Sequence, residues 1–181
     1  DLCYPINKSY DSFNRGINIC SIDSKFDMIT PNELKLNSSN YLGHIIKEDP
    51  NHLNSFTNVG FQSYFVQNDE VHEMEKMFFE TFRLGDFRKN IEEAEPFLRN
   101  SDLISFDLSS VRHSDAPSVV SPSPNGLFSH EACILSRYSG MSDRVSSFGI
   151  FEIDNETDLN NQTSNLISQI LWYFFEGFSL R

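Results

Sequence analysis

Apolar runs alternate along the chain with amphipathic segments, and this alternation predicts strands and helices in turn. Apolar runs at 17–23, 103–107 and 145–152 are typical of buried strands, and 56–65 alternates apolar with small or polar residues as a further strand does. Between them the pattern predicts helices at 40–46, from 68 onwards, at 90–98, at 129–138 and from about 158 to the end, with a brief strand possible at 83–85. Strands that alternate with helices predict a mainly parallel sheet in a three-layer α/β/α domain.

Two of the predicted helices show apolar residues at helical spacing. Asn68 is a suitable N-cap, and Asp69 and Glu70 follow it in the first turn, where negative charge is stabilised. The apolar face of this helix is expected to comprise Val71, Met74, Phe78 and Phe82, and that of the final helix Leu159, Leu166, Ile170, Leu171, Phe174 and Phe178.

Composition narrows the class of protein. A length of 181 residues with 39% hydrophobic residues suits one globular domain. The formal net charge of -12 argues against nucleic acid and anionic membrane surfaces as partners, because both require a basic face. No apolar run is long enough to span a membrane, and the first residues lack the core of a signal peptide. These features predict a soluble protein that acts on small molecules.

The cysteines give no sign of a disulfide framework or a zinc site. Cys3, Cys20 and Cys133 are odd in number, widely spaced and without a C-x-x-C motif. The expected compartment is therefore the cytoplasm.

Acidic residues stand where the predicted strands end. Asp23 and Asp27 follow the first strand, Asp107 ends another, and Glu152 ends the last. Carboxylates gathered at the carboxyl edge of a sheet suggest a hard divalent cation such as magnesium or manganese, although acids also commonly cap strand ends and the following helices. A long loop rich in Ser and Pro at 109–124 is a candidate binding loop.

Several passages resemble the ureohydrolase superfamily, which includes arginase, agmatinase and formimidoylglutamase, and most of all its formimidoylglutamase-like branch. They are S-F-D-L-S-S-V-R-H-S-D-A-P at 105–117, S-P-N-G-L at 123–127, E-A-C-I-L-S-R-Y-S-G-M-S-D at 131–143 and S-S-F-G-I-F-E at 146–152. The resemblance implies an arginase-like α/β fold and a pair of manganese ions that activate a bridging hydroxide. It also implies hydrolysis of a linear C–N amidine bond, in formiminoglutamate or a guanidino compound.

Carried over residue by residue, the family's metal site is incomplete. Where the family has Asp-Ala-His-x-Asp, this chain has Asp23-Ser24-Lys25-Phe26-Asp27, so lysine replaces the histidine ligand. Where the family has Ser-x-Asp-x-Asp, serine stands at position 109 in place of the second acid. Glu152 matches the glutamate that pairs with the cationic group of the substrate. None of the five histidines, His44, His52, His72, His113 and His130, falls at a family metal position.

The two replacements weaken a metal site. A lysine ammonium has no lone pair and repels a dication, and Ser109 offers only a neutral oxygen. Manganese binding is therefore expected to be weak, partial or absent, with Asp23, Asp27 and Asp107 as the remaining ligands. We hypothesise that the Lys25 ammonium takes the centre of the site, paired with these three acids; alternatively, Lys25 faces solvent and no cluster exists.

Two functions follow, from different classes. One is a hydrolase of linear C–N amidine bonds with a degenerate metal site, in which Glu152 binds the substrate. The other is a catalytically inactive protein of the same fold with a binding or structural role. Because the family domain extends upstream of Asp1, the chain is expected to be the C-terminal portion of a longer domain. Its open sheet edge would then be covered by the missing N-terminal segment or by a second copy in a homo-oligomer.

Overall fold

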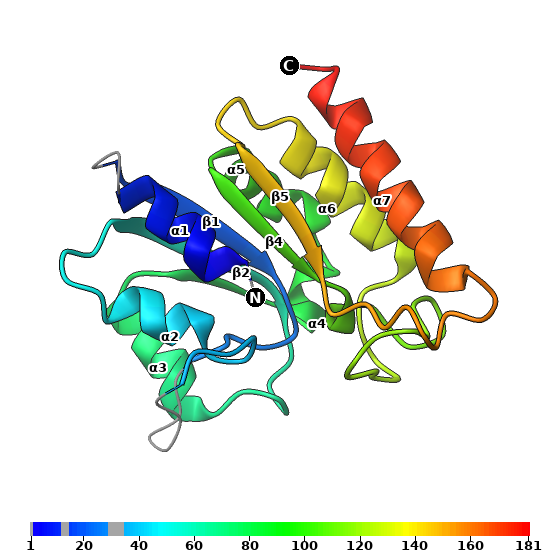
Figure 1. The fold of residues 1–181 in the computed structure, drawn as a ribbon, viewed down its shortest axis with the longest axis horizontal. Coiled ribbons are helices and arrows are strands. Elements are labelled where there is room, and N and C mark those ends of the chain that lie inside the picture. The colour runs from blue at the N-terminus through cyan, green and yellow to red at the C-terminus, as the bar shows by residue number, and fades with distance from the viewer. Residues whose placement is uncertain (1, 12–14, 29–34) are drawn as a thin grey trace.

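The protein forms a five-stranded sheet in the order β3-β2-β1-β4-β5, with helices on both faces (Figure 1). It is known from a computed structural model that describes residues 2–11, 15–28 and 35–181. The strands are β1 (Ile17–Ile22), β2 (Leu53–Phe61), β3 (Glu80–Arg83), β4 (Leu103–Asp107) and β5 (Ser147–Phe151). Every neighbouring pair is parallel, which confirms the predicted α/β class.

The helices divide between the two faces of the sheet and enclose two hydrophobic clusters. They are α1 (Cys3–Asp11), α2 (Tyr41–Ile46), α3 (Asn68–Lys76), α4 (Leu84–Phe87), α5 (Glu95–Arg99), α6 (Ser129–Gly140) and α7 (Gln162–Phe178), with short 3-10 turns at Ile91–Ala94 and Leu108–Ser110. One cluster joins Ile104 and Phe106 to Leu135 and Ile170, under α6 and α7. The other joins strand residues to α1, α2 and α3. The result is the expected three-layer arrangement.

Two expectations about apolar helix faces are wrong in part. α3 ends at Lys76, and Phe78 lies beyond it, 92% exposed, with a φ of 57°. Phe82 belongs to β3, because residues 80–83 pair with β2 and the chain must leave the helix to reach that position. Leu159 is 87% exposed and precedes α7, and Leu171 and Phe178 are exposed within the helix, whereas Leu166 and Ile170 are buried as expected.

The longest described helix, α7, packs closely along α6 (Figure 1). The contact depends on one glycine from each helix. A Cβ atom at Gly140 would lie 2.0 Å from the carbonyl oxygen of Phe174, and one at Gly177 would lie 2.1 Å from that of Arg137. Both neighbours are backbone atoms, so neither can move aside cheaply. No helix in the described part of the chain is both long and apolar enough to cross a membrane.

We expect Gly140→Ala to destabilise the protein by about 1–3 kcal/mol, because the added methyl group forces α6 and α7 apart. Gly85→Ala is the matched control, since a Cβ at Gly85 meets no atom within 4 Å. Urea unfolding of both variants measures the effect. Equal stability of Gly140→Ala and wild type would show that the two helices are not in close backbone contact.

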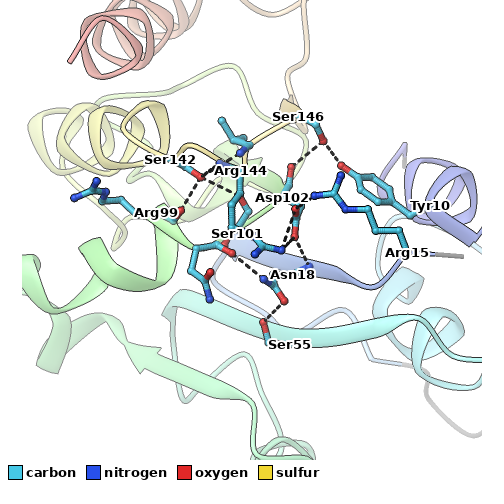
Figure 2. A network of polar contacts seen from close by, with 12 residues as sticks. Tyr10, Arg15, Asn18, Ser55, Arg99, Ser101, Asp102, Ser142, Arg144 and Ser146 are labelled. Carbon is cyan, nitrogen blue, oxygen red and sulfur yellow. Dashed lines mark hydrogen bonds and ion pairs between the residues drawn. The ribbon is translucent and has the colours of Figure 1, made fainter. Parts of the chain in front are cut away.

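A polar network ties three strands together at the amino edge of the sheet (Figure 2). Its centre is Asp102, which is 0% exposed. The backbone N–H of Asn18 donates to its carboxylate at 3.0 Å, as do Arg144 at 3.0 Å and Arg15 at 3.3 Å. The backbone N–H of Ser146 donates to the Asp102 carbonyl oxygen at 2.9 Å. These contacts join the starts of β1, β4 and β5 at the edge opposite the predicted site.

Candidate functional site

The carboxyl edge of the sheet brings together the acids predicted from the sequence. Asp23 directly follows β1, Asp107 is the last residue of β4, and Glu152 directly follows β5. Because β4 lies between β1 and β5 and all three strands are parallel, the strands end side by side. Asp27 lies four residues after Asp23 and returns to the same edge, where Asp107, Asp23 and Glu152 are near enough to influence the pKa of its carboxyl group.

Burial and mutual repulsion disfavour the charged form of Asp23, Asp27 and Asp107. Asp23 is 2% exposed, and burial and the nearby Asp27 carboxylate raise its pKa well above the ordinary value. Burial and Asp107 raise the pKa of Asp27 to about 7. Burial and Asp23 likewise raise the pKa of Asp107. Such a site favours a bound cation or retained protons, because either relieves the repulsion.

These shifts predict an unusual dependence of stability on pH. A carboxyl group whose pKa is higher in the folded than in the unfolded state stabilises the fold fully below its unfolded pKa of 3.8, and this stability is lost as the pH rises through the folded value, about 7 for Asp27. We therefore expect the metal-free protein to lose roughly 1–3 kcal/mol of unfolding free energy between about pH 5 and pH 8. Urea unfolding at several pH values measures this loss.

Asp27→Asn tests the origin of that loss. Asparagine tolerates the left-handed conformation of this position, so the variant removes the charge with little backbone strain. We expect the slope of stability against pH to become shallower. A wild-type protein that grows more stable from about pH 5 to pH 8 would contradict the assignment of raised pKa values.

The backbone at two of the acids is held in a conformation that these residues seldom adopt. Asp27 has a φ of 52° and Glu152 a φ of 65°. A left-handed conformation at a residue other than glycine costs about 1–2 kcal/mol and persists only where the surroundings impose it. Both residues lie at the edge of the same acidic site, although Phe78 and Asn161 share this conformation elsewhere in the described chain.

The neighbouring strand β2 supports the loop that carries Asp23 and Asp27. Asn58 is 0% exposed, and its side-chain amide donates to the carbonyl oxygens of Lys25 at 2.8 Å and Asp23 at 3.4 Å. Gly60, with a φ of 105°, passes close to the same Asp23 oxygen. The sequence reasoning missed Asn58; a polar residue within an apolar strand run was the signal that could have revealed it.

Lys25 does not form the ion pairs that we hypothesised. Its backbone N–H donates to a carboxylate oxygen of Asp23 at 3.0 Å, but its ammonium lies over the ring of Phe65, 5.7 Å from the ring centre. No ion pair joins that ammonium to an acid in the described part of the chain. Its charge still acts at longer range, since it lowers the pKa of both Asp23 and Asp27 against the larger effect of burial. Lys25 therefore flanks the acidic site.

Ser109 serves Asp107 as a hydrogen-bond donor. Its backbone N–H donates to a carboxylate oxygen of Asp107 at 2.6 Å, and its hydroxyl also bonds to that carboxylate and favours the charged form. The side chain is buried, with 5% exposure. The serine thus caps the end of β4 and supplies no second negative charge.

The residues present do not fit the manganese pair that the resemblance implies. Among the described residues, no three His, Cys, Asp or Glu side chains are grouped so that they could hold a metal ion. Position 25 has an ammonium where a metal needs a lone pair, and position 109 has a hydroxyl where the resemblance implies a carboxylate. The protein has carboxyl groups at the carboxyl edge of the sheet, but its donor set does not match two metal ions.

Solved structures with the same fold include formimidoylglutamase from Bacillus subtilis and formiminoglutamase from Trypanosoma cruzi, the latter described with two Mn2+ ions. The TM-scores are 0.83 and 0.85, each at 18% sequence identity and over 98% of this chain. The chain covers 57% and 62% of those two proteins, and so spans less than two thirds of their length. These likenesses confirm the arginase-like fold.

Sequence comparison points to the same group of proteins as the structural likeness does. A formimidoylglutamase from Staphylococcus haemolyticus is 33% identical over 85 residues, which are 46% of this chain and 27% of that protein. The model of the arginase family matches residues 2–176. The chain therefore belongs to the arginase family.

Proposed function

We propose that this protein is a degenerate member of the arginase family that binds a small cationic nitrogen compound of the amidine class and has lost metal-pair hydrolysis. The observation that supports this proposal is the arrangement of the acids at the carboxyl edge of the sheet. Asp23, Asp27 and Asp107 lie near one another at one edge of the sheet, whereas position 25 has a lysine whose ammonium lies over the ring of Phe65. In this proposal the site keeps its carboxyl groups and lacks the donors for two metal ions.

The acids remain useful for binding. A protonated amidine or guanidinium group offers several N–H donors, and carboxylates accept them in pairs. In this proposal Glu152 pairs with the cationic group of the ligand, and the acids at the ends of β1 and β4 complete the negative surface. Bound ligand would also relieve the repulsion that raises the pKa values of these acids.

The second candidate is a hydrolase of linear C–N amidine bonds with weak or partial manganese binding. One observation favours it: Asp23, Asp107 and Glu152 stand at the ends of adjacent parallel strands, and the charges of Asp107 and Glu152 reach Asp27 at the same edge. Carboxylate oxygens gathered in this way are suitable ligands for a divalent cation. Asp23, Asp27 and Asp107 would hold the remaining metal, with formiminoglutamate or a guanidino compound as substrate.

Turnover separates the two candidates. Purified protein is incubated with formiminoglutamate, arginine and agmatine in the presence of manganese, beside the Lys25→His/Ser109→Asp variant. We expect no measurable hydrolysis by the wild type, together with saturable binding of at least one of these compounds by calorimetry. Wild-type turnover well above the metal-free background would defeat the degenerate assignment and establish the hydrolase.

We also propose that the chain is the C-terminal portion of a longer family domain, and that a further segment or a second copy covers the edge of β5. The observation in support is the exposure of that strand: each residue of β5 is half-buried, whereas β1 is buried at every position. An open strand edge pairs readily with another strand. Size measurement in solution tests this, and a stable, compact monomer of these 181 residues would contradict it.

A further inference from the structure

We propose that a small pocket beyond the acidic site binds a carboxylate group. The pocket has a volume of about 130 Å³ and opens at the carboxyl ends of β2 and β3. Its lining includes Gln62 and Tyr64 after β2, Arg83 and Gly85 around the end of β3, and Asn125, which directly follows the loop at 109–124. Nothing in the proposal depends on a metal ion or on the fate of the acidic site.

Arg83 supplies a cation that the fold leaves available. It is exposed, and no side chain in the described residues forms an ion pair or hydrogen bond with its guanidinium. Asp86 lies three residues further along the chain and is paired with Lys89 at 2.6 Å, although the charge of Arg83 also lowers the pKa of this carboxyl group. Among the arginines of the described residues, only Arg83 and Arg181 form no ion pair, and Arg181 donates instead to the carbonyl oxygen of Gly140 at 2.9 Å.

The second arginine of the pocket, Arg88, already forms an ion pair and packs against an aromatic ring. Arg88 is bound to Glu131 at 3.0 Å, and its guanidinium lies 4.2 Å from the centre of the Phe128 ring. Its charge is therefore balanced, and Arg83 remains the group that can form a new pair. A guanidinium with free N–H groups is the side chain best suited to grip a planar carboxylate.

Neutral donors complete the opposite wall. The side-chain amide of Gln62 donates to the carbonyl oxygen of Asn125 at 3.3 Å, and the amide of Asn125 donates to the Tyr64 hydroxyl at 3.2 Å. The Tyr64 hydroxyl in turn donates to the side-chain amide oxygen of Gln62, which closes a ring of three contacts. Each amide group carries two N–H donors, so each keeps one for a ligand. The wall is thus pre-formed.

The pocket adjoins the acidic site through the loop that follows β2. The backbone N–H of Gln62 donates to the carbonyl oxygen of Ser24 at 3.0 Å, and Phe65 of the same loop lies under the Lys25 ammonium. The carboxyl edge therefore changes from negative at β5, β4 and β1 to positive at β3. A volume of this size suits a single carboxylate group with a short stem rather than a whole larger ligand.

Titration of the intact chain with acetate and with L-glutamate, followed by NMR or calorimetry, tests the proposal. We expect saturable binding at millimolar concentrations and a loss of about 10-fold or more in Arg83→Gln, since a charged hydrogen bond is removed. Gly85→Leu should weaken binding to a similar degree, because its side chain fills the pocket from a position with open space around it.

Arg99→Gln is the matched control, as it removes the same charge from α5 near the amino edge of the sheet. Its affinity should equal that of the wild type. The proposal is overturned if neither carboxylate saturates, if Arg83→Gln binds as the wild type does, or if inorganic phosphate binds while both carboxylates fail.

Discussion

Asp102→Ala is expected to destabilise the protein by about 3 kcal/mol, the largest loss of stability that we predict. The carboxylate is fully buried and receives hydrogen bonds from the Asn18 backbone and from two arginines. Without it, the Asn18 N–H is left unpaired inside the protein. The arginines lose their partner too, but their side chains are 61% and 40% exposed and can return to water. This rehydration places the loss at the lower end of the range for a broken buried ion pair, about 3–5 kcal/mol.

Urea unfolding measures this loss, and Asp143→Ala is its control. Asp143 directly precedes Arg144 of the network and is exposed, and its replacement should change stability by less than about 0.5 kcal/mol. The loss of stability in Asp102→Asn should fall between those of Asp102→Ala and Asp143→Ala, because the amide oxygen can still accept one of the hydrogen bonds. If Asp102→Ala unfolded at the same urea concentration as Asp143→Ala, the network of Figure 2 would not hold β1, β4 and β5 together.

Lys25→His/Ser109→Asp is expected to gain manganese affinity by on the order of 100-fold or more. Loss of an outer-sphere partner alone typically costs 10- to 100-fold in metal affinity, and this variant restores two direct ligands. The imidazole supplies a lone pair where the ammonium repelled a dication, and the new carboxylate stands two residues after Asp107. Calorimetric titration with manganese measures the gain.

The single variants Lys25→His and Ser109→Asp are the controls for this gain. Each should bind manganese less tightly than the double variant, because each restores only one donor. Without metal, Ser109→Asp should also be less stable than the wild type, since it adds a charge beside acids that already repel one another. No increase in affinity in the double variant would mean that something other than these two residues excludes the metal.

The fold could be predicted from sequence because its signals are local. The buried strands β1 and β4 appear as apolar runs, and the alternation with helices is sufficient to predict a parallel sheet. Errors arose where tertiary pairing overrides local spacing. Phe82 continues the helical spacing of Val71 and Met74, yet it lies in β3 because β2 offers it hydrogen-bond partners. Leu159 likewise fits the spacing of α7, but the helix begins only at Gln162.

The positions of the acids in the candidate site could be predicted from the sequence, but the position of the Lys25 ammonium could not. Asp23, Asp107 and Glu152 end adjacent parallel strands, so their proximity follows from topology. The position of the Lys25 ammonium depends on Phe65, a residue of another loop 40 positions away, and on the left-handed backbone at Asp27. Neither feature leaves a local signal. Charge alone therefore suggested ion pairs between Lys25 and the acids. The arrangement of the loops places the ammonium over Phe65 instead.

The most direct test of a site that has lost its metal pair is the manganese content of the wild-type protein. The protein is purified or refolded with manganese, freed of loosely bound ions, and measured by elemental analysis. We predict well below one equivalent per chain. Nearly two tightly bound equivalents would contradict the account, because Lys25 and Ser109 would then have failed to exclude the pair.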